Sequence, residues 1–424
     1  MAADEAGGSS GPGLLTPYVD VLGTPHAARM VLFGFVGRLP LSMVGLGSVL
    51  LVESYTGSYG LGGVVAATGA VATAVLGPVI GRYADSVGQR RVLLPIVVVH
   101  LVGGLVFLFS VRSQSGDHAW PLWVVFVAVG VAGGALPPIS SMIRTRWSYL
   151  LRGSPRLNTA LAFESVVDEL VFIVGPVLVT FLSTTGHTTS GLVTAFTLAV
   201  AGGLLFAAQV ETEPPPSGHH PHRGPSALRT PGLLVLCPVG AALGMVLGSV
   251  QVGLVAFADK VDKEALSGVL IASLAVGSMV AGILWGLRHW SSELRRRLLL
   301  TLAALSAGSL ALVFVPTMWL MLVLVFLAGT AVSPSLISAF TLTERLIPPR
   351  LVTEGFTWLG TAIGLGVAVG VAAAGKLIDR FDANAAFAVA AVAAGIATAV
   401  VLVGQPVLDE QRVRSAVVPA SRVP

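Results

Sequence analysis

Four ionisable side chains lie inside stretches of the sequence that are otherwise apolar, and they are the first candidates for chemistry. Arg38 lies about nine residues into one apolar segment, and Glu164, Asp168 and Glu169 lie in another. If these segments cross a membrane, each charge costs roughly 2.5–3.5 kcal/mol at the bilayer centre, so such residues usually mark a transport pathway or a charge pair. A carboxyl group that gains and loses a proton there would couple proton movement to transport.

The spacing of these residues predicts which of them meet. Glu164 and Asp168 share a helix face, whereas Glu169 is turned about 100° away. Arg38 and Asp168 lie ~14 and ~16 Å from the starts of their segments at the helical rise, so they reach a similar depth. Two interpretations follow. Asp168 or Glu164 carries the proton while Arg38 modulates it, or Arg38 and Asp168 form a structural ion pair and Glu164 is hydrated.

A second candidate is the charged connection at residues 81–91, GRYADSVGQRR. Its two glycines, Gly81 and Gly88, are expected to let the backbone turn between antiparallel helices. Asp85 is placed to cap a helix N-terminus or to pair with a basic residue at the end of the connection, Arg90 or Arg91.

Helix breakers occur at matching places in two apolar segments. Proline bends or interrupts a helix, and nearby hydroxyls add polar groups, so these positions are candidates for bends beside a cleft. The candidates are Pro137, Pro138 and Ser141 in the fourth segment, Gly175 and Pro176 in the fifth, and Pro334 and Ser338 in the tenth.

The composition decides the environment of these residues. Of 424 residues, 54% are hydrophobic and only 11% are Asp, Glu, Lys or Arg, whereas soluble domains carry roughly 25% charged residues. This excludes a soluble enzyme, a nucleic-acid-binding protein and a disordered scaffold. No GxxxxGK[ST] or HExxH motif occurs. We therefore expect an all-α membrane protein with no enzyme activity, no cofactor and no metal.

Twelve apolar segments are long enough to span a bilayer, which takes about 20 residues. We expect an N-terminal disordered tail (1–28), a six-helix bundle (29–209), a linker (210–230), a second six-helix bundle (231–404) and a C-terminal tail (405–424). The segments run over 29–52, 60–81, 92–111, 120–143, 157–183, 190–209, 231–257, 265–287, 298–315, 318–342, 353–376 and 385–404.

Basic residues alternate between the two sides of this arrangement. One set of connections and tails holds nineteen Lys and Arg, the other holds five, and Arg38 lies within a segment. Since basic loops stay in the cytoplasm, both chain ends are predicted to be cytoplasmic. Arg outnumbers Lys strongly, which is typical of GC-rich bacteria, so we expect a multi-pass protein of a bacterial cell (plasma) membrane, the inner membrane.

The linker is rich in proline and histidine and shows no helical period. Its histidines could bind a metal, but a solvated linker is the simpler interpretation, and we favour it. They are His219, His220 and His222.

The two halves repeat each other. Residues 77–94 and 282–300 both place two glycines four apart before a charged connection that ends in consecutive arginines. Such duplication suggests a transport cleft between the halves, near the bilayer midplane.

Residues 81–91 resemble motif A of the major facilitator superfamily: glycine, three residues, aspartate, a basic residue, any residue, glycine, then basic residues. Ser86 and Gln89 depart from that form. The resemblance implies twelve transmembrane helices in two pseudo-symmetric six-helix bundles. It also implies that the connection latches the cytoplasmic faces together through Gly81, Asp85, Gly88, Arg90 and Arg91.

Two further motifs of the superfamily are incomplete here. Motif C, found in its antiporters, survives only as Gly175-Pro176. The arginine of motif B, in the fourth segment, is replaced by Phe126 ahead of Gly130. We expect a monomeric secondary transporter of the efflux-like branch, with a small molecule, protons and lipid as partners and no nucleic acid. It would export a drug, sugar or metabolite, and the movement of protons would supply the energy. A proton-coupled importer and a lipid flippase or sensor are the alternatives.

Overall fold

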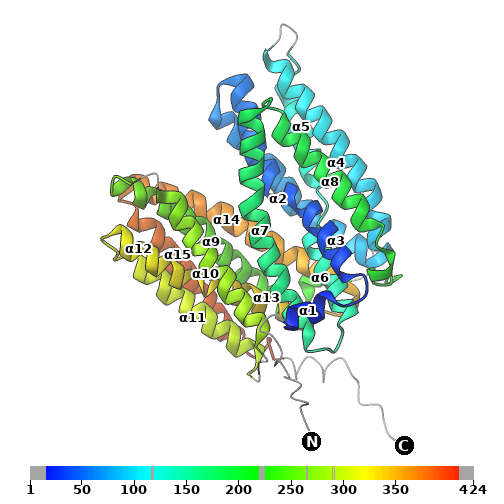
Figure 1. The fold of residues 1–424 in the computed structure, drawn as a ribbon, viewed down its shortest axis with the longest axis vertical. Helices are drawn as coiled ribbons and strands as arrows, with labels where there is room; N and C mark the ends of the chain where they lie inside the picture. Colours follow the sequence, from blue (N-terminus) through cyan, green and yellow to red (C-terminus); the bar gives the residue numbers. More distant parts are fainter. Residues whose placement is uncertain are drawn as a thin grey trace, which may run out of the picture.

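The computed structural model describes residues 16–115, 119–218, 225–263, 266–288, 290 and 292–409. The described chain folds into two helical bundles that lie side by side and splay apart toward one end (Figure 1). The N-terminal bundle contains α1 (Thr16–Leu22), α2 (Ala27–Thr56), α3 (Tyr59–Val87), α4 (Gln89–Arg112), α5 (Leu122–Gly134), α6 (Ile139–Leu150), α7 (Arg156–Thr185) and α8 (Ser190–Ala207).

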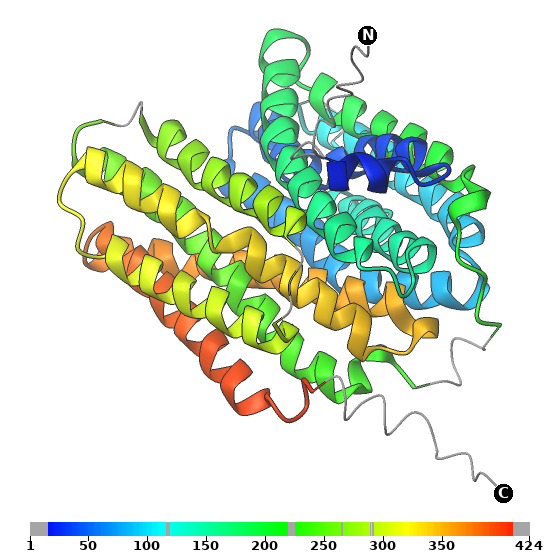
Figure 2. The same cartoon turned by 60° about the horizontal axis from the view of Figure 1, so that its bottom comes forward.

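The C-terminal bundle repeats this order, and Figure 2 shows it beside the first from a second direction. Each bundle has six spans, because α5 with α6 and α12 with α13 each form one interrupted span. The C-terminal helices are α9 (Pro231–Lys260), α10 (Ser267–Leu287), α11 (Leu294–Leu312), α12 (Met318–Gly329), α13 (Val332–Leu346), α14 (Val352–Arg380) and α15 (Asn384–Gly404). Short 3-10 turns are η1 (Ser113–Ser115), η2 (Val210–Thr212), η3 (Ala227–Arg229) and η5 (Pro349–Leu351).

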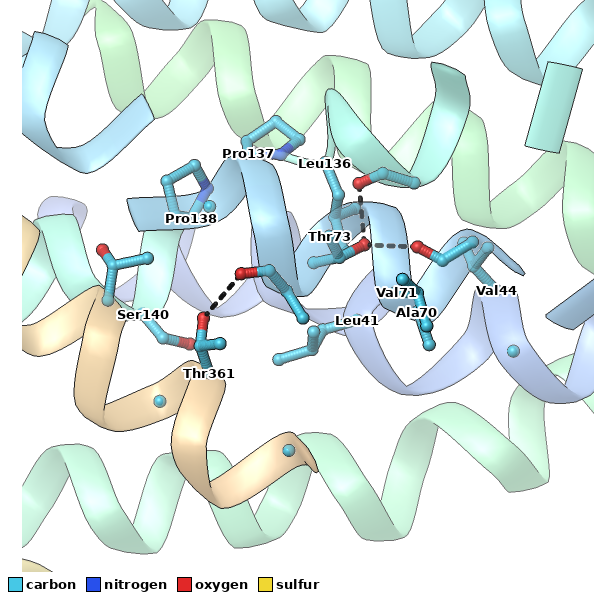
Figure 3. Close-up of a pocket in the computed structure, with 18 of the residues that line it drawn as sticks. Leu41, Val44, Ala70, Val71, Thr73, Leu136, Pro137, Pro138, Ser140 and Thr361 are labelled. Atoms are coloured by element: carbon cyan, nitrogen blue, oxygen red, sulfur yellow. Dashed lines mark hydrogen bonds between the residues drawn. The ribbon is translucent and has the colours of Figure 1, made fainter. Parts of the chain in front are cut away.

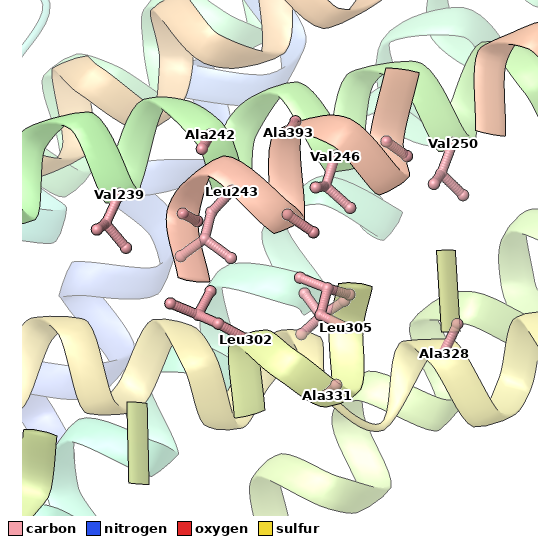
Figure 4. Packing of buried hydrophobic residues seen from close by; sticks show 14 of the residues in the cluster. Val239, Ala242, Leu243, Val246, Val250, Leu302, Leu305, Ala328, Ala331 and Ala393 are labelled. Carbon is pink, nitrogen blue, oxygen red and sulfur yellow. The ribbon is translucent and has the colours of Figure 1, made fainter. Parts of the chain in front are cut away.

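Eleven spans within the described residues are long and apolar enough to cross a membrane by themselves. The twelfth, α11, carries three consecutive arginines in its first turn, 295–297, which lower its hydropathy. Its Leu298, Leu302 and Leu305 are buried in the core of the C-terminal bundle. Leu302 and Leu305 point toward Leu243 and Val246 of α9 (Figure 4). Arginines at a helix end reach toward the polar membrane surface, so the span remains compatible with a bilayer.

The predicted helix breakers behave differently from one another. Span 4 is interrupted at Pro137 and Pro138, as expected, and span 10 is interrupted at residues 330–331. Pro334 lies in the first turn of α13, where its missing N–H costs nothing. By contrast, α7 continues unbroken past Pro176. Gly175 instead permits close packing on α2, since a Cβ there would collide with the Ser42 hydroxyl.

The duplicated glycine pairs form two seams between the bundles. In α3, a Cβ on Gly77 would lie 3.2 Å from Thr357 of α14, and one on Gly81 would lie 2.8 Å from the same side chain. In α10, a Cβ on Gly286 would lie 2.7 Å from Ala162 of α7. Small residues let helix backbones approach closely in a membrane, so the sequence repeat marks the contact surface of the two halves.

Two local predictions are wrong. Residues 81–87 are the last turns of α3, so Gly81 makes no turn, and the connection to α4 is Gly88 alone, at φ 103°. The tail predicted as disordered over 1–28 contains the helix α1, whose Tyr18 hydroxyl donates to the Ile283 carbonyl of α10 at 2.8 Å. This short helix therefore belongs to the contact between the bundles.

The start of the linker also packs. The Ser217 N–H donates to the Asp85 carbonyl at 2.9 Å, and the Gly218 N–H donates to the Ser86 carbonyl at 3.2 Å. The end of the linker forms η3 against the C-terminal bundle. The histidine cluster at His219, His220 and His222 lies outside the described residues.

Candidate functional site

Asp85 joins the two bundles where α3 ends. Its carboxylate oxygens accept the backbone N–H groups of Thr353 at 3.1 Å and Glu354 at 2.9 Å, which belong to the first turn of α14. The first N–H groups of a helix have no partner within the helix and carry the positive end of its dipole. Asp85 thus caps a helix of the opposite bundle. We call the end of the molecule that holds this contact the Asp85 side.

Other contacts seal the same side. The Thr353 hydroxyl donates to the Thr145 hydroxyl of α6 at 3.0 Å, and the Thr159 hydroxyl of α7 donates to the Gly286 carbonyl of α10 at 2.7 Å. The last residues of the motif do not take part, since Arg90 and Arg91 are exposed. The Arg90 N–H instead donates to the Glu213 carboxylate at 3.0 Å, and a Cβ on Gly88 would lie 3.0 Å from the same oxygen.

A cavity of about 400 Å³ lies between the bundles. Its wall is mostly apolar, as Leu41, Val44 and Ala70 illustrate (Figure 3). A volume of this size suits a small organic molecule, since ligand pockets run from about 300 to 1,000 Å³. The N-terminal bundle and α14 supply the wall; it includes Gly37, Arg38, Leu41, Val44, Ser48, Ala70, Val71, Thr73, His100, Leu136, Pro137, Pro138, Ser140, Ser141, Thr357, Thr361 and Leu365.

The polar groups of this wall are largely satisfied by the protein itself. Thr73 donates to backbone carbonyls of α3 and α5, and Thr361 donates to the Ala74 carbonyl (Figure 3). His100 bonds the Ala132 carbonyl through Nδ1 at 2.7 Å, which makes Nδ1 the protonated nitrogen. The predicted cleft residues Pro137, Pro138 and Ser141 lie on this wall, whereas Ser338 is buried in α13 and bonds the Pro334 carbonyl.

The cavity is open on the side away from Asp85. Val71 of α3 and Leu365 of α14 line it and are 56% and 47% exposed. Because the contacts described above close the Asp85 side, the structure shows one of the two states expected of alternating access: sealed at Asp85 and accessible from the opposite side.

Arg38, which lines the cavity, belongs to a compact cluster of two arginines and two carboxylates. Arg38 Nη1 lies 2.7 Å from Glu164 Oε2 and 2.9 Å from Asp168 Oδ1, and Arg144 Nη2 lies 2.5 Å from Asp168 Oδ2. Trp147 Nε1 donates to the other Glu164 oxygen at 2.7 Å. We call Arg38, Glu164, Asp168 and Arg144 the charge quartet. Its formal charge is zero, so each ion is compensated within the cluster.

The quartet confirms that Arg38 and Asp168 meet, and that Glu164 shares their face. Glu164 is fully buried, however, and is not the hydrated residue that one interpretation required. Arg144 was missed because the apolar pattern ends at residue 143. The helix restarts after Pro138, which carries Arg144 one and a half turns into α6, where it is buried and stacks 4.1 Å from the Phe340 ring. It supplies a span-4 arginine that the superfamily's motif B position, Phe126, lacks.

Arg146 is a second arginine that the sequence placed in a connection and the structure buries. Its side chain donates to Gln89, to the Gln209 carbonyl and to Thr212, at 2.7–2.8 Å, and stacks on Phe206. It ties α6 to α4 and to the start of the linker, so its task is structural.

Glu169 is turned away from the face of Glu164 and Asp168, as the helical spacing predicts, and it faces the opposite bundle. Its Oε1 is within hydrogen-bonding distance of the hydroxyls of Ser278 on α10 and Ser333 on α13, the latter at 2.6 Å. Its Oε2 is buried and has no hydrogen-bond partner. Within the described residues, no group of three His, Cys, Asp or Glu side chains could hold a metal ion.

Two six-span bundles around a central cavity, sealed on one side, define a membrane transporter. The sequence profile of the Major Facilitator Superfamily matches residues 30–288 and 256–423, and the chain belongs to that family. It is therefore a transporter and not an enzyme. No curated protein sequence matches it.

Solved structures of the same fold support this assignment. A bacterial homologue of the iron transporter ferroportin, in an outward-facing state, superposes with a TM-score of 0.72 at 16% identity, covering 89% of this chain and 99% of that chain. The human organic anion transporter MFSD10 (TETRAN) gives 0.65 at 17% identity, covering 90% and 99%. FucP in the outward conformation gives 0.65 at 11% identity, covering 89% and 98%. At these identities the likeness concerns the fold.

Proposed function

We propose that this protein is a proton-coupled secondary transporter that exports a small organic compound by alternating access. The observation that carries the proposal is a cavity open on one side only, with Arg38 of the charge quartet in its wall and a carboxylate cap closing the other side. The motif A segment and the remnant of motif C favour export. We further propose that it works as a monomer in a bacterial plasma membrane.

The Asp85 side is proposed to be cytoplasmic, because nineteen of the basic residues belong to connections and tails on that side. The state described here is then outward-open. Asp85 acts as a latch in this proposal: its cap on α14 must break before the cytoplasmic side opens, and must form again before substrate leaves outside.

Cysteine labelling in intact cells tests this orientation. In a Cys237→Ala background, Lys263→Cys on the opposite side should react with an impermeant maleimide, and Arg91→Cys should react only after the membrane is permeabilised. Both positions are exposed, whereas Ser86 is buried and unsuitable. Labelling of Arg91→Cys in intact cells would invert the topology.

The cavity favours an uncharged, mostly apolar substrate. Of the described residues that line it, Arg38 is the one with a formal charge, and the quartet already compensates that charge. A charged substrate would therefore lose its hydration without gaining an unpaired partner.

A matched series of naphthalene derivatives tests this preference. The probes are 1-naphthalenemethanol, 1-naphthoate and 1-naphthylmethylammonium, and the measurement is protection of Ala70→Cys, on the cavity wall, from maleimide. We expect the alcohol to protect at about tenfold lower concentration than either ion, the ratio that 1.4 kcal/mol of desolvation produces. Stronger protection by one of the ions would assign a charged substrate.

The direction of transport distinguishes export from the importer alternative. Vesicles that contain the protein should accumulate an exported compound when their lumen is more acidic than the medium, because protons that leave the lumen exchange for the compound. Accumulation only when the lumen is more alkaline than the medium would show a proton-coupled importer, since the compound then enters together with protons. Movement of a labelled phospholipid, with no movement of soluble compounds, would show a flippase.

A further inference from the structure

A closed triangle of oxygen atoms joins the two bundles at Glu169. Ser278 Oγ and Ser333 Oγ both contact Glu169 Oε1, and they lie 2.9 Å from each other. All three edges of the triangle are therefore within hydrogen-bonding distance. One corner comes from α7 of the N-terminal bundle and the other two from α10 and α13 of the C-terminal bundle.

The number of hydrogen atoms in this triangle depends on the state of Glu169. Each serine hydroxyl supplies one hydrogen, and an ionised carboxylate supplies none. An ionised Glu169 thus leaves one edge with two facing oxygens and no hydrogen between them. A proton on Oε1 completes the ring: Glu169 donates to Ser278, Ser278 donates to Ser333, and Ser333 donates to Glu169.

The surroundings of Glu169 also favour the neutral acid. Oε2 is buried without a partner, and an ionised carboxylate leaves that charge uncompensated. The ionisable neighbour is Asp168 on the same helix, and both of its oxygens are held by the arginines of the quartet. The groups that face Glu169 from α10 and α13 are serine hydroxyls, and Arg38 of α2 and Arg144 of α6 are directed to Asp168 and Glu164.

We infer that Glu169, Ser278 and Ser333 form a proton-binding site that is complete only while the two bundles touch here, as they do in the Asp85-sealed state. Separation of α7 from α10 and α13 removes both serines and exposes the acid, which then releases its proton. This site rests on the proposed function, since it names the group that couples protons to the change of state. The quartet stays ionised and neutral as a whole.

Infrared spectroscopy of the purified protein tests the site without a substrate. We expect a band from the C=O stretch of a protonated carboxylic acid at neutral pH that is absent from Glu169→Gln and retained in Asp382→Asn, an exposed carboxylate. In the Ser278→Ala/Ser333→Ala double variant, the band should shift or vanish, because both ring partners are gone. A spectrum that is the same in wild type and Glu169→Gln would overturn the inference.

The pH dependence of the conformation gives a second test. The rate of maleimide labelling is measured for Val71→Cys, at the open mouth of the cavity. It is divided by the rate for Lys263→Cys, which is exposed and therefore shows how the thiol–maleimide reaction itself changes with pH. The normalised rate should rise as the pH falls, by at most about tenfold per pH unit for one coupled proton. Glu169→Gln, whose amide supplies the missing hydrogen, should label fast at every pH. If it follows the wild-type pH curve instead, Glu169 is not the coupled group.

The two proposals fail separately. A Glu169-dependent acid band in a protein that never responds to a pH gradient would refute proton-coupled transport and leave the site standing. Uphill transport by Glu169→Gln under a pH gradient would refute the site and leave the proposed function standing.

Discussion

Asp168→Asn is expected to destabilise the protein by about 3 kcal/mol, the lower end of the cost of removing one partner of a buried ion pair, since the Asp168 side chain is 27% exposed while both of its arginines are buried. The neutral amide leaves two buried arginines, Arg38 and Arg144, with Glu164 as their only remaining anion in the quartet. Poor expression and a lower midpoint of thermal unfolding in detergent should follow. Arg38→Ala should also be destabilising, because it leaves Glu164 buried without its cation.

Asp382→Asn is the matched control. Asp382 pairs with Lys260 at 2.9 Å, the same length as one bond of Asp168, but both side chains are 44% exposed. Hydrogen bonding to Lys260 holds the pKa of Asp382 below its usual value. An exposed pair of this kind contributes little, so the control should unfold close to wild type. If Asp168→Asn is as stable as the control and loses only uphill transport, then Asp168 is a coupling carboxylate and not a structural one.

Asp85→Asn should change the balance between the two states more than it changes the stability of the fold. Loss of the charge at the N-terminus of α14 removes ~1–2 kcal/mol from the Asp85-sealed state, a factor of about 5–30 in its population. In a Cys237→Ala background, Ser141→Cys on the cavity wall should then react faster with a maleimide applied from the Asp85 side than it does in the protein that keeps Asp85. Gly81→Val should act in the same direction, because its side chain would push against Thr357.

Arg91→Ala controls for a general effect of changing this segment. Arg91 is exposed and lies outside the cap, so its loss should leave the labelling rate of Ser141→Cys unchanged. Equal labelling in wild type and Asp85→Asn, together with equal flux, would show that the cap does not latch the state.

Much of this arrangement could be predicted because membrane spans leave strong local signals. Apolar length gives the spans, and the helical period places Glu164 and Asp168 on one face and Glu169 on another. The repeated glycine pairs in the sequence lie where the two bundles contact each other, but the prediction that Gly81 turns the backbone is wrong. Gly81 serves close packing, which depends on a helix of the other half that the local sequence does not show.

The parts that were missed depend on contacts between distant residues. Arg144 follows the last apolar residue of its span, so a hydropathy window ends before it, and only the restart of the helix after Pro138 buries it. The helix α1 is too short to be read from periodicity, and it is held by the contact of Tyr18 with α10. The serine partners of Glu169 come from two helices more than a hundred residues away.

Simultaneous measurement of proton and solute flux in proteoliposomes tests proton-coupled alternating access most directly. Vesicles that hold a pH-sensitive dye receive a panel of uncharged apolar compounds, with and without an imposed pH gradient. We predict that at least one compound accumulates uphill only when the gradient is present, and that its movement dissipates the gradient in the same vesicles. Proton coupling would be contradicted if the compound only reached equal concentrations on the two sides of the membrane, at the same rate with and without the pH gradient and with no proton flux.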